Sequence, residues 1–60
     1  MGAAYNEGYL MAHLAGARMI NGVIHGAPPC TFRDERLRWS WYRGLYDYTQ
    51  DMLYARARLK

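Results

Sequence analysis

Cysteine is almost absent from this sequence, which has Cys30 alone among its 60 residues. The chain therefore cannot form an internal disulfide, and a lone thiol is typical of a reducing compartment. Long apolar runs are absent too, because polar residues interrupt every apolar stretch well before the roughly 20 residues that a membrane span needs. The N-terminal segment lacks the basic start and apolar run of a signal peptide. These absences predict a cytoplasmic protein that is not embedded in a membrane.

Paired metal ligands and catalytic groups are also missing. His13, His25 and Cys30 are the only soft metal ligands, and none of them shows the short paired spacing of a zinc site. Cys30 has no base that the sequence places beside it, so a small thiol packed beneath a loop is the simpler interpretation. There is no glycine-rich phosphate loop after a strand. We therefore predict no enzyme activity, no catalytic residues, no metal and no cofactor.

The length limits how much core the chain can bury. Sixty residues form one domain, 1–60, which buries only about 60% of the surface exposed by the unfolded chain. A chain of this size normally needs a disulfide, a metal or a partner surface to be stable. Because the sequence supports neither a disulfide nor a metal site, we expect a partner surface to stabilise the chain.

Positive charge is concentrated in the second half of the chain. The formal net charge is +3, and seven of the 8 basic residues lie at or after Arg33. Seven of the 8 basic residues are arginine. Arginine pairs well with phosphate and carboxylate groups and stacks on aromatic rings. Five acidic residues lie among them, so a solvated helix face of mixed charge explains the composition as well as an anionic partner does.

The first predicted helix covers residues 4 to about 21. Its small residues repeat at spacings of three and four and lie along one face. Glycine costs about 1 kcal/mol in a helix interior, which indicates that another helix approaches this face closely. The Asn21-Gly22 pair is a plausible helix stop, since both residues tolerate the left-handed conformation. The residues of the small face are Gly8, Ala12, Ala15 and Gly16.

A connection over 22–30 precedes the second predicted helix, which runs from about 32 to 58. Pro28-Pro29 cannot continue a helix. Thr31 then matches a helix N-cap, with Asp34 three residues later completing a pattern like a capping box.

The second helix carries a clear apolar face. At 100° per residue, its large apolar residues fall within one sector, bordered by Gly44. Bulky side chains on this face complement the small face of the first helix. The predicted fold is therefore all-α, a two-helix antiparallel hairpin with the longer helix at the C-terminus. The predicted core face consists of Leu37, Trp41, Leu45, Tyr48, Met52, Ala55 and Leu59.

A second stripe of large side chains lies about 120° from that core face. It consists of Trp39, Tyr42, Tyr46 and Leu53, and Arg36 and Arg43 flank Trp39 at spacings of three and four. One short helix cannot cover both faces, and an uncovered patch on a small protein usually marks an interface. Aromatic rings beside arginines can stack bases and contact phosphate. A protein partner, including a second copy of the chain, explains the stripe equally well.

Several residues form a spaced motif. Cys30-Thr31-Phe32, Arg38, Trp41 and Gly44 resemble the signature of the ribosome modulation factor family, which is Cys-Pro-Tyr, five residues, Arg, two residues, Trp, two residues, Gly. Upstream, Gly8-Tyr9 and Ala15-Gly16 resemble the family's Gly-Tyr and Ala-Gly segment. The resemblance covers about half the chain. Departures are Thr31 in place of proline, Leu45 in place of a second tryptophan, a longer connection, and the lack of a basic N-terminal arm.

The resemblance implies a small protein that binds ribosomal RNA on the small subunit and takes part in ribosome hibernation, a form of translation regulation. Arg36, Trp39 and Arg43 are then the expected RNA contacts, with Tyr42, Tyr46 and Leu53 beside them. The same fold class includes small plasmid and phage proteins, one of them reported in connection with fluoroquinolone resistance. The alternative is therefore a phage- or plasmid-borne protein that modulates a host protein through the second stripe. In either case, the unmatched apolar surface predicts a two-fold homodimer.

Overall fold

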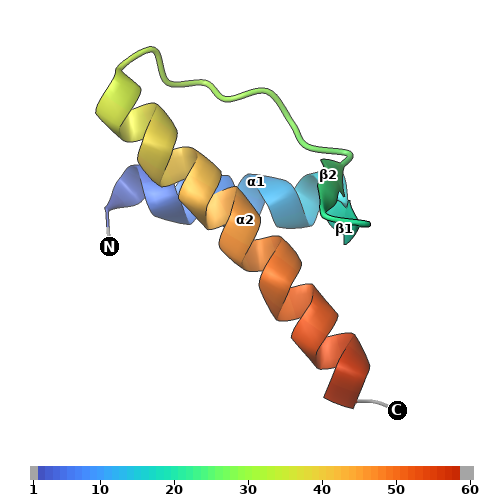
Figure 1. The fold of residues 1–60 in the computed structure, drawn as a ribbon. Helices are drawn as coiled ribbons and strands as arrows, with labels where there is room; N and C mark the ends of the chain where they lie inside the picture. The colour runs from blue at the N-terminus through green and yellow to red at the C-terminus, as the bar shows by residue number, and fades with distance from the viewer. Residues whose placement is uncertain (1, 59–60) are drawn as a thin grey trace.

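The structure is a computed structural model that describes residues 2–58. Helix α1 spans Ala3–Ala15, strand β1 spans Arg18–Ile20, strand β2 spans Val23–His25 and helix α2 spans Glu35–Arg58. The predicted all-α two-helix hairpin is wrong in two respects. A two-stranded antiparallel sheet separates the helices, and α1 crosses α2 instead of running alongside it (Figure 1). The predicted core residue Leu59 lies outside the described residues.

Helix α1 ends at Ala15, earlier than predicted. Gly16 has a φ of 70° and a ψ of 32°, the left-handed conformation that glycine adopts without strain. Its N–H donates to the carbonyl of His13, and the N–H of Ala17 donates to the carbonyl of Ala12. These two bonds form a Schellman motif, which satisfies carbonyls that the helix end leaves unpaired. Ala12 and Ala17 are both buried and complete the motif with an apolar contact.

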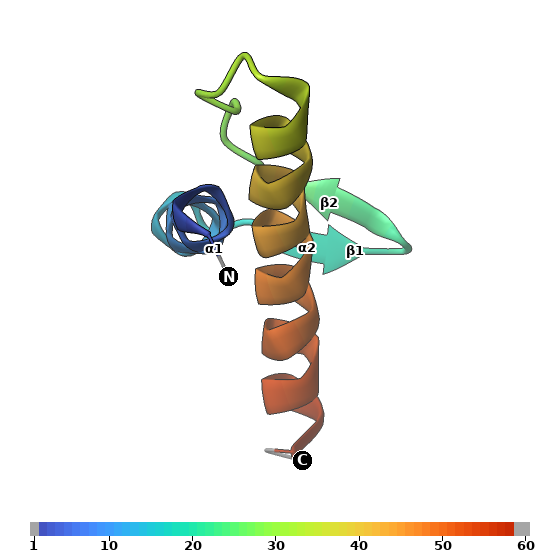
Figure 2. The ribbon, with the colours of Figure 1, turned by 90° about the vertical axis from the view of Figure 1, so that its left-hand side faces the viewer.

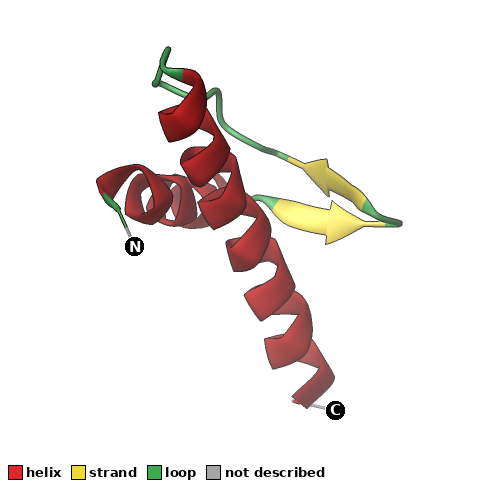
Figure 3. Cartoon of the chain, turned by 60° about the vertical axis from the view of Figure 1, so that its left-hand side comes forward, coloured by secondary structure: helices red, strands yellow, loops and turns green. Residues whose placement is uncertain are grey.

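The Asn21-Gly22 pair forms the turn of a β-hairpin, so its predicted role as a helix stop is wrong. Asn21 and Gly22 have φ values of 50° and 78°. Two successive residues with positive φ are typical of the type I′ turn, whose twist matches that of the flanking strands. The strands pair Met19 with Ile24, and Ile20 with Val23 next to the turn. The hairpin projects away from the helices with its turn at the far end (Figure 3).

Helix α2 begins at Glu35, three residues later than predicted, and Asp34 is its N-cap. The Oδ1 atom of Asp34 accepts a hydrogen bond from the backbone N–H of Arg36 at 2.9 Å. Thr31, the predicted cap, instead donates its hydroxyl to Glu7 of α1 at 2.7 Å. The connection therefore extends to Asp34, and Thr31 ties it to the first helix.

Two glycines form the crossing point of the helices. A Cβ atom on Gly8 would lie less than 3.0 Å from the carbonyl oxygen of Trp41, and one on Gly44 would lie as close to the carbonyl of Tyr5. Either helix backbone therefore touches the other directly at this point. The predicted close approach is confirmed for Gly8, Ala12 and Gly44, which are all buried. The other two members of the small face, Ala15 and Gly16, are exposed.

The core occupies only the middle of α2. Trp41, Leu45 and Tyr48 are buried, as predicted, but Leu37, Met52 and Ala55 are exposed. The reason is the crossing: α1 lies on one side of α2 and the strands on the other, and both ends of α2 extend past them (Figure 2). Half-buried side chains close the edges of the core, namely Tyr9, Met11, Ile24, Cys30 and Phe32.

Neither α1 nor α2, over the residues that the structure describes, has an apolar stretch long enough to cross a membrane.

Candidate nucleic-acid interface

All four residues of the second stripe are exposed. Trp39 is 72% exposed, Tyr46 46%, Tyr42 43% and Leu53 41%. Their sequence spacings of three, four and seven place them in one row along α2. At Tyr42 and Tyr46 the row lines an open groove with Tyr5 of α1 and Ile24 of β2, which leave these side chains exposed. The predicted uncovered surface is therefore present in the fold.

Trp39 is the largest exposed side chain of the row. The other tryptophan, Trp41, is completely buried and makes an edge-on contact with the ring of Tyr42, whose centroid lies 5.2 Å away. Trp39 lines an open groove with Glu35, Arg38 and Tyr42. An indole this exposed contributes little to the core, so its stacking face is available to a ligand.

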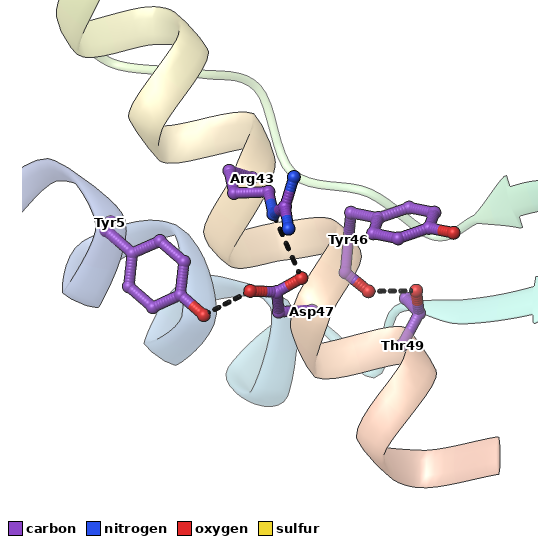
Figure 4. A network of polar contacts seen from close by, with 5 residues as sticks. All are labelled: Tyr5, Arg43, Tyr46, Asp47 and Thr49. Carbon is purple, nitrogen blue, oxygen red and sulfur yellow. Dashed lines mark hydrogen bonds and ion pairs between the residues drawn. The ribbon is translucent and has the colours of Figure 1, made fainter. Parts of the chain in front are cut away.

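Arg43 is held by an acidic neighbour. Its Nε atom lies 3.3 Å from Oδ1 of Asp47, one helical turn further on. The other carboxylate oxygen of Asp47 accepts a hydrogen bond from the hydroxyl of Tyr5, which joins α1 to this pair (Figure 4). That hydrogen bond raises the pKa of Tyr5, because it stabilises the protonated hydroxyl. The charge of Arg43 is thus partly neutralised, which makes it a weaker phosphate contact than predicted.

Arg36 and Arg38 have no such partner. Both are exposed, and among residues 2–56, whose side chains the structure describes, the single ion pair is that of Arg43 with Asp47. Arg38 matches the family motif but is not among the interface residues predicted from the sequence. Its position four residues before Tyr42 could have placed it at the interface, since residues four apart are neighbours on a helix.

A series of polar contacts fixes the crossing of α1 on α2. Tyr9 donates its hydroxyl to Asp51 at 2.6 Å, parallel to the bond between Tyr5 and Asp47. The bond to Asp51 raises the pKa of Tyr9 to about 12, with burial and the charge of Asp51 adding to the effect. Nδ1 of His13 lies 3.2 Å from the hydroxyl of Tyr48. These contacts orient the helices.

The remaining motif residues contribute to packing. Trp41 is the centre of the core, and its Nε1 atom is buried without a hydrogen-bond partner among the described residues. Cys30 and Phe32 pack against the core from the connection, and the Cys30 thiol lies 3.8 Å from the Phe32 carbonyl. Together with Gly8 and Gly44 they specify the fold, whereas Arg38 is the motif residue that faces solvent beside Trp39.

Within residues 2–58, no three His, Cys, Asp or Glu side chains lie close enough together to hold a metal ion. The second stripe offers aromatic surface and hydroxyl groups, and arginines lie beside it. These groups suit binding by stacking and by contacts to phosphate.

Comparison with known proteins returns no match: no family model, no curated protein and no solved structure is similar to this chain. The resemblance to the ribosome modulation factor family therefore rests on the motif residues alone and stays a hypothesis.

Proposed function

We propose that this protein binds RNA through the second stripe, and that it acts without catalysis as a small modulator of translation on the ribosome. The observation that supports this most directly is the position of Trp39. It is 72% exposed, and Arg36 and Arg38 beside it have no ion-pair partner among the described residues.

Stacking supplies the first part of the binding energy. A base stacked on an aromatic side chain contributes about 1–3 kcal/mol, and any base can stack because each has a π face. Trp39 has an accessible ring, and Tyr42 lines the same groove. Loss of the Trp39 ring therefore weakens RNA binding by about 5- to 150-fold.

Arginine contacts to phosphate supply the second part. Arg38 lines the groove that holds Trp39, and Arg36 lies one turn before Trp39 on α2. Such contacts release counterions, so the affinity falls steeply as salt is added. Ribosomal RNA is the target that the motif resemblance favours, because unpaired bases and dense phosphates both occur there.

Co-sedimentation with purified small ribosomal subunits tests this function. We expect the parent to co-sediment at low salt, to be released as salt rises, and to be released by nuclease. Trp39→Ala should lose most of the binding. Leu14→Ala is the matched control, because Leu14 is 69% exposed but lies on α1, away from the second stripe. Equal binding by both variants would refute the proposal.

A protein partner is the second candidate, and a specific feature of the surface favours it. Tyr42 and Tyr46 line an open groove together with Tyr5 of α1 and Ile24 of β2, so three elements contribute apolar atoms to one surface. A second copy of the chain or a host protein would bury this groove. Such binding would tolerate salt and be lost in Tyr46→Glu. Sedimentation of parent and Tyr46→Glu over a concentration series distinguishes a homodimer from a monomer.

A further inference from the structure

A third groove lies further along α2, where β1 packs beside it. Its volume is about 190 Å³, and one wall is the end of α1 and the start of β1, from Gly16 to Met19. The other wall is α2, with Tyr48, Thr49, Met52, Leu53 and Arg56. A groove of this size has room for a small solvated group.

Two arginines from distant parts of the sequence line this groove. Arg18 comes from β1 and Arg56 from the last turns of α2, and no acidic residue lines the groove with them. Both arginines are exposed, and neither has an ion-pair partner among residues 2–56. An anion bound between or beside two like charges offsets their mutual repulsion. The charge of the groove is therefore complementary to an anionic ligand.

The groove continues the row that begins at Trp39. From Tyr46 the row steps seven residues to Leu53, past buried Thr49, which also lines this groove, and Arg56 follows three residues later. Leu53 is thus a member of the second stripe and also part of this groove. At 1.5 Å per residue, the row from Trp39 to Arg56 is about 25 Å long. One extended polyanion can follow it.

We infer that Arg18 and Arg56 form a phosphate-binding site for the same RNA whose bases stack on Trp39. Arginine suits this role, because its planar guanidinium binds two phosphate oxygens at once. RNA fits the structure better than an isolated anion, because Leu53 of the second stripe also lines this groove. This inference rests on the proposed function. It extends the RNA-binding surface from the start of α2 to the last turns of that helix.

Salt dependence of RNA binding separates this site from the Trp39 end. Each phosphate contact to a single strand adds about 0.7 to the slope of log K against log salt concentration. Anisotropy titrations with a fluorescein-labelled single-stranded RNA, over a series of salt concentrations, measure that slope. In the double variant Arg18→Gln/Arg56→Gln we expect the slope to become shallower by about 1.4. Trp39→Ala should weaken binding at every salt concentration and leave the slope unchanged.

Two controls keep the outcome interpretable. Arg18→Lys/Arg56→Lys retains both charges and should retain most of the slope. Arg33→Gln removes an exposed arginine that lines neither the groove of Trp39 nor the groove of Arg18 and Arg56. It should change the slope less than Arg18→Gln or Arg56→Gln alone. The Arg18 and Arg56 site is overturned if the double glutamine variant has the same salt slope as the parent, or if Arg33→Gln changes the slope as much as Arg18→Gln or Arg56→Gln does. Binding that still depends on Trp39 would in that case continue to support the proposed function. A parent that binds no RNA overturns both.

Discussion

Replacement of Gly44 by alanine tests the crossing of the two helices. In an exposed helix interior this substitution stabilises a protein by about 1 kcal/mol, because alanine is the better helix former. Here the added methyl group would meet the carbonyl of Tyr5 and the backbone nitrogen of Tyr9, both less than 3.0 Å away. These are backbone atoms, so no change of rotamer can relieve the overlap. The helices must separate, and the contacts around Trp41 are then lost.

The expected cost follows from that overlap. Overpacking in a core typically costs about 1–3 kcal/mol, which is a large share of the stability of a 60-residue domain at roughly 0.05–0.15 kcal/mol per residue. A domain of this size loses about 4–8 °C of melting temperature for each kcal/mol. Gly44→Ala should therefore melt many degrees below the parent. Gly8→Ala should behave likewise, and the effects of the two should not add, because both substitutions disturb the same contact.

Thermal unfolding followed by circular dichroism measures the effect. Gly2→Ala is the control, because Gly2 has a φ of −82° and a Cβ atom there would meet nothing within 4 Å. Gly2 is the N-cap of α1, where alanine is less favourable than glycine by up to about 1 kcal/mol, so we expect this control to melt only a few degrees below the parent and above Gly44→Ala. If Gly44→Ala melted at or above the parent temperature, the close crossing of α1 and α2 would be refuted.

Three further predictions follow from the same contacts. Trp41→Ala should cost about 3–5 kcal/mol, enough to unfold the domain, because the side chain is completely buried; a folded variant with the parent melting temperature would contradict this. Asp34→Ala should cost about 1 kcal/mol through loss of the N-cap, and urea titration should find Thr31→Ala less affected, because its hydroxyl bond to α1 is exposed. Because the pKa of Tyr9 is raised to about 12, its contribution to stability is complete below pH 10 and is lost as the pH rises from about 10 to 12. Urea titrations at pH 9 and pH 11 should show a smaller loss in Tyr9→Phe than in the parent.

The central part of α2 is the part of the fold that the sequence predicts well. Its apolar residues repeat with a helical period over many turns, so the pattern places Trp41 inside and Trp39 outside. Gly8 and Gly44 carry a second signal, because glycine in a helix interior is unfavourable unless a backbone must come close. Both predictions hold because each depends on the helix face that a residue occupies and not on the angle at which the helices cross.

The hairpin is not predicted, because two structures share one local signal. Asn21-Gly22 suits both a helix end and a type I′ turn, since each needs residues with positive φ. The strands on either side are three residues long, too short to show an alternating pattern. The helix ends at Ala15, and Gly16 is its C-cap.

The prediction is wrong at the two ends of the core for another reason. A helical period identifies a face but not the angle at which a partner helix crosses it. The crossing leaves Leu37 and Met52 exposed and brings Tyr5 and Tyr9 onto Asp47 and Asp51. At the candidate site, the pairing of Arg43 with Asp47 could have been predicted, because oppositely charged residues four apart on a helix interact.

Tryptophan fluorescence during an RNA titration tests the central claim most directly. The chain has 2 tryptophans, of which Trp39 is 72% exposed and Trp41 is completely buried, so only Trp39 can stack on a base without unfolding. We predict that single-stranded RNA quenches the solvent-exposed emission of the parent, and that Trp39→Phe, which retains Trp41 alone, shows no quenching. Parent emission that stays unchanged up to saturating RNA, or equal quenching in Trp39→Phe, would contradict binding through the second stripe.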